Sequence, residues 1–238
     1  MIRLDKYMCD LGIGSRSEVK NWIRKGMVIV DGEVAGKPEQ KLDEQTAVLT
    51  FQGQEYSYVR YVYYMMNKPA GVITATSDAR ERTVLDLLRE ELAAQGIPLR
   101  PGISPVGRLD KDTEGLLLLT NDGALSHHLL SPRHHVAKTY EVHCAKPILR
   151  EAVAQLKAGV DIGEESPTLP AEVTTLTDSV ILLTIYEGKF HQIKRMMQAV
   201  DNEVVYLKRL QMGTLCLDES LKKGGIRPLT MEELHDLQ

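Results

Sequence analysis

Four consecutive leucines, Leu116 to Leu119, lie between a charged loop at residues 107–115 and a turn sequence at residues 121–123. An apolar run of this length with turn residues on both sides is typical of a strand buried on both faces, so it predicts a central strand of a sheet. Asp110 precedes this run. A carboxylate at the mouth of a buried strand is held rigidly and loses part of its water, which makes Asp110 a candidate for chemistry.

The composition narrows the class of protein. With 238 residues, the chain is long enough for one large domain, or for a medium domain and a small one. No window contains the ~18 consecutive apolar residues that a membrane helix needs, and the first residues lack an apolar signal core. We therefore expect a cytoplasmic protein with no membrane partner. The cysteines Cys9, Cys144 and Cys216 lie far apart without ligand spacing, so we expect no metal site.

The first 58 residues have the pattern of a separate small domain. Apolar residues at helical spacing predict a helix over residues 4–11, and Ser15, with a glutamate three residues later, forms a capping box that opens a second helix. The polar residues 54–57 are typical of a linker. Short strands are predicted at residues 27–30, 33–34 and 47–51. We therefore expect two domains, at residues 1–58 and 59–238.

Residues 59–238 mix helices and strands without regular βαβ spacing, which favours the α+β fold class. The segment at 67–71, Asn-Lys-Pro-Ala-Gly, predicts a turn. The predicted strands cover residues 61–66, 116–119, 139–142 and 180–186. The predicted helices cover residues 84–95, 124–130, 150–158 and about 190–200.

The N-terminal unit is cationic although the whole chain carries a net charge of −4. Residues 1–30 contain six cations against the three acids Asp5, Asp10 and Glu18. A solvated helix face is one interpretation, and a surface that contacts RNA phosphates is the other. The second interpretation gives a candidate RNA-binding set: Arg3, Lys6, Ser15, Arg16, Lys20, Arg24 and Lys25.

Three interpretations of the Asp110 loop compete. Its acids fit the first positions of a calcium-binding loop, but the leucines that follow belong in a sheet, which disfavours calcium. A purely structural turn is the second interpretation. The third is a catalytic carboxylate beside Arg108, with Lys194 or Arg195 as the cation that keeps it ionised once water is excluded.

Tyr140 and two histidine pairs also have alternative interpretations. Tyr140 is either a sheet tyrosine with a surface hydroxyl or a ring that stacks on a nucleobase. The pairs His127-His128 and His134-His135 have no carboxylate or cysteine at ligand spacing, so they favour polar surface rather than a metal site.

Several segments together resemble the RsuA-type rRNA pseudouridine synthases. Residues 106–123 resemble the catalytic motif of that family, and residues 2–34 are similar to an S4 RNA-binding domain. The resemblance covers nearly the whole chain. The further matching segments are residues 67–71, 131–140, 187–197 and 227–233.

The resemblance implies a role for each matching residue. Asp110 corresponds to the essential aspartate, Lys194 to the basic residue that pairs with it, and Tyr140 to the tyrosine that stacks on the base and serves in proton transfer. Arg108 is implied to hold the extruded nucleotide's place, and Ile193 to pack against the target base. With Asn67 and Lys68 of the first motif, they form the expected substrate-binding set. The implied fold is an α+β domain with a long mixed sheet and a central cleft, working without cofactor or metal.

The implied activity is the conversion of a uridine in ribosomal RNA to pseudouridine. The motifs are most similar to the branch that acts on 16S rRNA, so the expected partner of a monomeric enzyme is 16S rRNA or a pre-30S particle. A 23S rRNA enzyme and a non-catalytic rRNA-binding assembly factor are the alternatives. A glycoside hydrolase with Asp110 and Asp112 as paired acids is disfavoured, because we expect these two side chains to face opposite ways.

Overall fold

A computed structural model describes residues 1–237 of the chain, which form two compact units. One unit contains Met1–Val62 and Leu88–Ile103, and the other contains Tyr63–Leu87 and the chain from Ser104 onward. We keep the proposed domain limit between residues 58 and 59, because one strand ends at Ser57 and the next begins at Tyr63.

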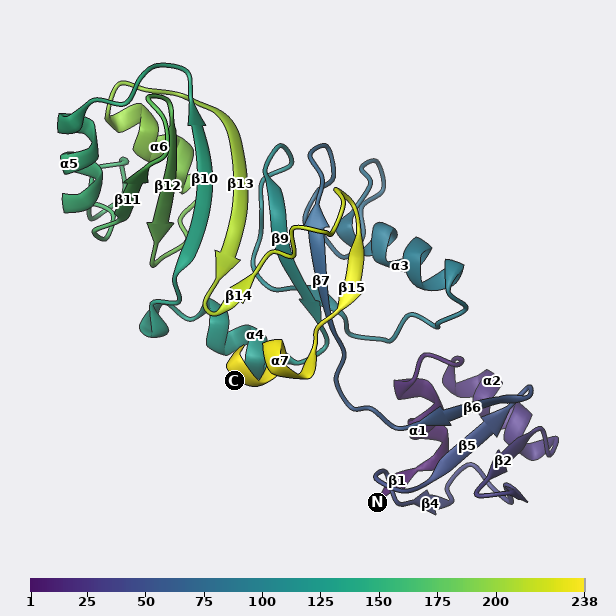
Figure 1. Cartoon of the computed structure of the whole chain (residues 1–238). Coiled ribbons are helices and arrows are strands. Elements are labelled where there is room, and N and C mark those ends of the chain that lie inside the picture. The colour runs from purple at the N-terminus through teal and green to yellow at the C-terminus, as the bar shows by residue number, and fades with distance from the viewer. Residues whose placement is uncertain (238) are drawn as a thin grey trace. The chain divides into compact units, whose positions relative to one another are not determined.

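Residues 1–57 of the first unit, called the N-terminal unit below, form two helices and two small antiparallel sheets, one of two strands and one of four (Figure 1). Helix α1 (Leu4–Asp10) and helix α2 (Arg16–Arg24) bury apolar residues such as Tyr7, Met8 and Ile23 in its core. The predicted capping box of α2 is present, since Ser15 and Glu18 bond each other's backbone amides. The strands are β1 (Ile2–Arg3), β2 (Val28–Val30), β3 (Glu33–Val34), β4 (Lys41–Leu42), β5 (Val48–Phe51) and β6 (Gln54–Ser57).

The expected linker at residues 54–57 is wrong, because these residues are strand β6. Gln52 and Gly53 both adopt positive φ angles, of 52° and 79°, which makes a tight hairpin turn and returns the chain along β5. A glutamine is an uncommon residue in such a turn, and the strand is polar because it lies at the edge of the sheet. Gly53 was therefore a turn signal that the sequence analysis did not use, whereas the strand itself has no apolar pattern.

A single mixed sheet of nine strands organises the second unit within residues 1–237. The order along its main path is β11-β12-β10-β13-β9-β7-β15, and only the β13–β9 pair is parallel. This mixed sheet, together with the helices, confirms the predicted α+β class. Its strands are β7 (Tyr63–Lys68), β8 (Ser104–Pro105), β9 (Glu114–Thr120), β10 (Lys138–Cys144), β11 (Glu172–Thr175), β12 (Val180–Ile185), β13 (Val204–Met212), β14 (Leu215–Cys216) and β15 (Ile226–Pro228).

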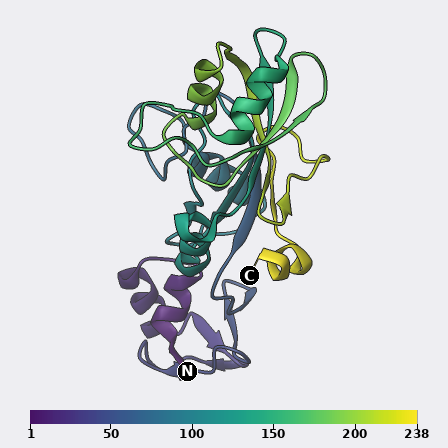
Figure 2. The same ribbon diagram turned by 90° about the vertical axis from the view of Figure 1, so that its left-hand side faces the viewer.

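Helices pack against this sheet and supply its core. Helices α5 and α6 lie on the same side of the β11–β12–β10–β13 part (Figures 1 and 2). Helix α4 contributes Leu125 and Leu129 to a cluster that includes Met65 of β7 and Leu116 of β9. The helices are α4 (Gly123–Leu130), α5 (Arg150–Ala158), α6 (Gln192–Ala199) and α7 (Met231–Leu237), with a 3-10 turn at Pro132–His134. Helix α3 (Val84–Ala94) begins in this unit, and its residues from Leu88 belong to the first unit.

Strand β9 confirms the prediction made from the leucine run, because all seven of its residues are buried. Gly115 allows its parallel pairing with β13. The glycine has a φ of 100°, and a Cβ atom there would lie 2.2 Å from the carbonyl oxygen of Arg209. The close approach of the two backbones therefore requires glycine directly after the Asp110 loop.

The turn predicted at residues 67–71 begins too early. Asn67 and Lys68 are the last residues of β7, where they pair with Leu116 and Gly115 of β9. The chain turns only at Gly71, whose φ is 86°. Pairing with a distant strand outweighs the local turn preference of Asn-Lys-Pro.

Candidate active site

A cleft of about 570 Å³ opens within the second unit, over one face of β10 and β13. Its walls come from the Asp110 loop, from β10 and β13, and from the segment that leads into α6. Lining residues used below are Arg108, Asp110, Lys138, Tyr140, Phe190, His191, Ile193, Lys194 and Arg209. Four segments far apart in the sequence thus meet at one hollow.

Backbone hydrogen bonds fix the loop that carries Asp110. The Asp110 carbonyl accepts from the amide of Thr113 at 3.1 Å, which closes a turn. Thr74 donates its hydroxyl to the Leu109 carbonyl at 2.7 Å and accepts from the Leu109 amide at 3.2 Å. The amide of Gly71 donates to the Lys111 carbonyl at 2.7 Å. The carboxylate therefore projects from a rigid turn.

Lys68 lies beneath this loop, fully buried. Its ammonium donates to the carbonyls of Pro69, Asp110, Lys111 and Thr113 at 2.9–3.4 Å. Burial lowers its pKa to about 8, against the attraction of the nearby acids. The expected contact between Lys68 and substrate does not fit this position, because no atom of the side chain reaches the cleft surface; Lys68 supports the loop instead.

Asn67 is likewise buried and binds protein rather than the cleft. Its side-chain amide donates to the Leu221 carbonyl at 2.7 Å, and its backbone pairs with Gly224 and Gly225. This arrangement fastens the segment before β15 to the end of β7. The expected role of Asn67 in substrate binding does not fit these contacts either.

The carboxylate of Asp110 faces two side chains from the segment around α6. Its Oδ2 lies 3.3 Å from the Nζ of Lys194, and its Oδ1 lies 3.6 Å from the Nε2 of His191. Lys194 also donates to both carboxylate oxygens of Asp112, at 2.7 and 2.8 Å. The structure thus places the expected cation beside Asp110 and adds His191, which the sequence analysis did not single out.

The expectation that Asp110 and Asp112 face opposite ways is wrong, because both carboxylates contact Lys194. Residues two apart share a face of an extended segment, and the turn closed at Thr113 brings them closer. The hydrogen bond from Lys194 lowers the pKa of Asp112. Burial alone would favour neutral Lys194, but Asp112 and Asp110 together raise its pKa, so the amine stays charged.

Tyr140, Ile193 and Arg108 all reach the cleft, as expected. Tyr140 and Ile193 are almost wholly buried, whereas Arg108 is exposed. Within residues 1–237, Arg108 makes no hydrogen bond or ion pair. An unpaired guanidinium at the mouth of a cleft is available for a phosphate group.

Arg209 and Lys138 also line the cleft. Arg209 lies opposite Tyr140 in the β10–β13 register; its Nε donates to the Leu116 carbonyl at 2.7 Å, while its buried Nη2 has no partner in the described chain. Lys138 lies two residues before Tyr140, and its pKa is lowered by burial and by the nearby Arg209. Only the pairing of distant strands brings them together, so the sequence alone gave no signal for Arg209.

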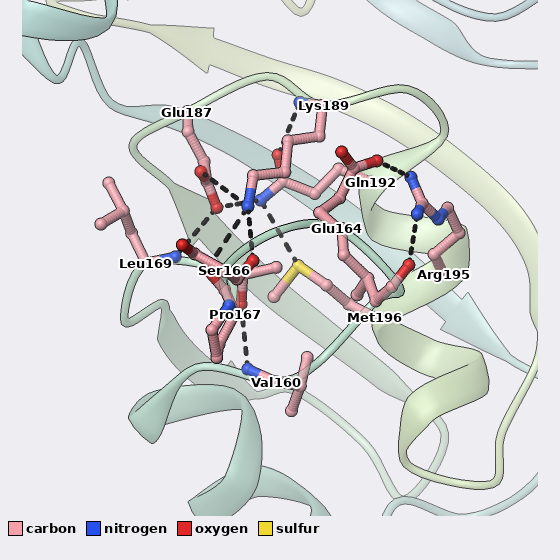
Figure 3. Close-up of polar contacts among 12 residues, drawn as sticks. Val160, Glu164, Ser166, Pro167, Leu169, Glu187, Lys189, Gln192, Arg195 and Met196 are labelled. Atoms are coloured by element: carbon pink, nitrogen blue, oxygen red, sulfur yellow. Dashed lines mark hydrogen bonds and ion pairs between the residues drawn. The ribbon is translucent and has the colours of Figure 1, made fainter.

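Arg195, the alternative partner for Asp110, points elsewhere. Its Nη1 bonds Glu164 at 2.6 Å (Figure 3). The same atom bonds the Phe190 carbonyl at 3.1 Å, and the guanidinium also donates to the Ile162 carbonyl. Lys194 is therefore the cation that faces Asp110.

A polar network joins the loop at residues 160–169 to the segment that carries Lys194. Glu187 accepts from the amide of Leu169 and from the side chain of Gln192, both at 2.9 Å (Figure 3). Lys189 donates to the carbonyls of Ser166 and Pro167 at 3.1 and 3.3 Å. These bonds hold the start of α6, and so they fix where His191 and Lys194 enter the cleft.

Among the candidate RNA-binding residues of the N-terminal unit, some cations are paired with acids, and others, called open cations below, make no side-chain bond within residues 1–237. Arg3 bonds Asp5 at 2.8 and 2.9 Å, and Lys6 bonds Asp10 at 2.5 Å. Ser15 is engaged in capping α2. The cations Arg16, Lys20, Arg24 and Lys25 show no such bond in the part of the chain that the structure describes.

Neither a metal cluster nor a membrane span is present in residues 1–237. No group of three or more histidines, cysteines and acids is arranged to hold a metal ion there. Among the described helices, none is long and apolar enough to cross a bilayer.

Comparison with known proteins identifies the family. The RNA pseudouridylate synthase family model matches residues 62–199, and the S4 domain model matches residues 2–48. Similar sequences include an uncharacterized RNA pseudouridine synthase, YtzG, of Bacillus subtilis, 50% identical over 98% of this chain and 97% of the relative. Ribosomal small subunit pseudouridine synthase A of Vibrio cholerae is 41% identical, and that of Salmonella typhimurium is 40% identical, over 98% of each chain.

A solved structure agrees with the sequence matches. A crystal structure of a pseudouridylate synthase is 36% identical and covers 100% of both chains, with a TM-score of 0.69. The family model covers more than half of this chain, and the relatives match nearly all of it. The chain therefore belongs to the RNA pseudouridylate synthase family and carries an N-terminal S4 domain.

Proposed function

We propose that this isomerase converts a specific uridine of 16S rRNA to pseudouridine, with Asp110 as the reactive carboxylate. The choice of the small subunit is supported by the relatives from Vibrio cholerae and Salmonella typhimurium, whose names specify that subunit. The chemistry is supported above all by the position of Asp110 between Lys194 and His191 in the cleft.

The target uridine leaves its stack and enters the cleft, since a base inside a helix cannot be reached. Arg108 holds the nucleotide through its phosphate, and Ile193 packs against the base. Tyr140 stacks on the uracil and serves in proton transfer. An unstacked or loosely folded RNA segment is accordingly the preferred substrate.

Asp110 acts beneath the ribose, where it either adds to C1′ or removes the 2′ proton, and both routes break the N1–C1′ bond. The uracil then turns, and C5 forms a new bond with C1′. The C5 proton is lost and N1 gains a proton, so no atoms or electrons are exchanged overall. The positive charge of Lys194 lies 3.3 Å from Asp110 Oδ2 and attracts the carboxylate within the cleft.

The N-terminal unit positions the RNA through phosphates, using cations that include Arg16, Lys20, Arg24 and Lys25. The enzyme acts as a monomer in the cytoplasm, on 16S rRNA or on a pre-30S particle. A phosphate contact carries no sequence information, so the choice of uridine depends on the cleft and on the fold of the RNA.

Pseudouridine mapping tests this proposal. Both 16S and 23S rRNA are mapped in cells that lack the gene, and again after complementation with the wild-type chain. We expect one pseudouridine of 16S rRNA to disappear and return. Loss of a pseudouridine from 23S rRNA would show that the substrate is the large-subunit RNA. Unchanged maps of both RNAs would favour a non-catalytic assembly factor.

A further inference from the structure

Phe190 is an aromatic residue left exposed at the cleft. The chain has two phenylalanines; Phe51 is 4% exposed in the core of the N-terminal unit, whereas Phe190 is 65% exposed and lines the cleft. Single exposed apolar residues are common on protein surfaces, so exposure alone decides nothing. What distinguishes Phe190 is the group against which it lies.

The ring of Phe190 stacks on the ring of His191, with centroids 3.8 Å apart and planes 19° apart. His191 is the residue whose Nε2 lies 3.6 Å from the carboxylate of Asp110. The stacked pair therefore extends from the reactive carboxylate outward to the rim of the cleft, with Phe190 as its outer member.

The backbone under this pair is fixed. Arg195 bonds the Phe190 carbonyl at 3.1 Å, and the amide of Lys189 donates to the side chain of Gln192 at 2.9 Å. His191 adopts a left-handed conformation, with a φ of 48°, at the start of α6. An aromatic surface held by these bonds is ordered in advance, so a ligand that stacks on it loses little further conformational freedom in the protein.

We propose that Phe190, backed by His191, is a stacking platform for an unpaired nucleobase adjacent to the target uridine in the RNA. This inference rests on the proposed function. Extrusion of the uridine breaks its stacking with the neighbouring bases, and an aromatic side chain is a replacement surface that accepts any base. Phe190 lines the same cleft as Asp110 and is 65% exposed, so its ring is accessible to a base beside the extruded uridine.

The platform also explains why an apolar ring lies among charged groups. Lys189 and Lys194 line the cleft with positive charges that attract the RNA backbone. The Phe190 ring adds contact with a base rather than with a phosphate. Binding through Phe190 therefore depends weakly on salt, in contrast to binding through the cations.

Paired changes in protein and RNA test the platform. The probe is a short fragment of 16S rRNA that contains the mapped uridine, with an abasic nucleotide placed in turn on its 5′ or 3′ side. Affinity is measured by fluorescence anisotropy in an Asp110→Asn background, which prevents turnover. The variants are Phe190→Leu, which removes the ring, and Phe190→Trp, which keeps an aromatic surface.

We expect Phe190→Leu to weaken binding of the intact fragment roughly 5- to 150-fold, the range for one base stacked on an aromatic side chain. Phe190→Trp retains the affinity. One of the two abasic fragments binds the chain with Phe190 more weakly than the intact fragment does, by a similar factor. On that abasic fragment, Phe190→Leu causes no further loss of affinity. Leu149→Ala is the control, because Leu149 is 66% exposed but does not line the cleft.

Equal losses from Phe190→Leu on intact and abasic fragments would contradict the proposal and would leave Phe190 as a cover for His191. No loss on the intact fragment would also contradict it. Tritium release by the wild-type enzyme on the intact fragment tests the proposed function separately. If the wild type releases tritium but Phe190→Leu does not weaken binding, only the stacking platform is refuted. Thermal unfolding of each variant confirms that the chain is folded.

Discussion

Cations gather in two regions of the molecule, on the N-terminal unit and around the cleft of the second unit, and the two sets differ in burial. Lys20 is half-buried and Arg16, Arg24 and Lys25 are exposed, whereas Lys68 and Arg209 are buried. Exposed cations bind a polyanion through long-range attraction that salt screens. Buried cations act over short distances on particular groups. The comparison therefore assigns most of the salt-dependent RNA affinity to the N-terminal unit, and turnover mainly to the cations of the cleft.

The largest effect expected from this comparison comes from Lys194→Met. The variant leaves Asp110 without its nearest cation in a partly desolvated cleft, so turnover at saturating RNA falls by about 100-fold or more. RNA affinity changes little. Single-turnover tritium release with 5-tritiated uridine RNA measures the loss, with the exposed Lys157→Met as the control. A turnover within threefold of the wild type would remove Lys194 from the mechanism.

Neutralising the open cations should have the converse effect. In the combined variant Arg16→Gln, Lys20→Gln, Arg24→Gln and Lys25→Gln, we expect affinity to fall about 10- to 100-fold with turnover at saturating RNA unchanged. If all four contact phosphates, the slope of log affinity against log salt decreases by up to about 3. A salt titration of binding checks this. An unaltered slope would end the assignment of RNA binding to this surface.

Lys68→Met tests whether a buried cation acts through the loop that it supports. The change removes the donor for four loop carbonyls, so we expect turnover to fall about tenfold while RNA affinity is retained. Stopped-flow or quench kinetics at saturating RNA measures turnover separately from RNA affinity. Equal losses in affinity and turnover would indicate general unfolding rather than a displaced Asp110.

The lowered pKa of Lys68 predicts that both stability and turnover depend on pH. Its folded pKa of about 8 lies below the ordinary 10.5, so the unfolded chain binds more protons between these pH values. The contribution of Lys68 to the free energy of unfolding therefore rises with pH across that window. Turnover should decline above pH 8 as the amine loses its charge. A profile that is flat from pH 7 to 10 would contradict this role.

The smallest effect is expected for Asp112→Asn. Asp112 is exposed and shares Lys194 with Asp110, so the change removes one of two acids that keep Lys194 charged. We expect a loss of about threefold near neutral pH that increases under alkaline conditions, as the pKa of Lys194 falls. A loss as large as that of Asp110→Asn would give Asp112 a direct part in the reaction.

Features governed by nearby residues were predictable from sequence. The capping box at Ser15, the helix at residues 150–158 and the leucine strand β9 all follow local patterns, and the structure contains each of them. Strand β13 was missed because Lys208 and Arg209 interrupt its apolar pattern, although its neighbours β10 and β9 stabilise it. Pairing between distant segments is not encoded in any short window.

The candidate site was predictable in part for the same reason. The resemblance led to Asp110, Tyr140 and Lys194, and all three line the cleft. It also led to Lys68 as a substrate contact, whereas Lys68 is buried beneath the Asp110 loop and supports that loop. His191, Lys138 and Arg209 were not selected, because their importance depends on which side chains the sheet brings together.

Tritium release by the Asp110→Asn variant is the most direct measurement of the central claim. The substitution keeps the size of the side chain but removes its charge, and RNA binding is measured in parallel. Asp178→Asn, an exposed carboxylate of the same unit that does not line the cleft, is the control. We expect Asp110→Asn to bind RNA nearly as well as the wild type and to release no tritium above background; release at the wild-type rate would contradict the assignment of the chemistry to Asp110.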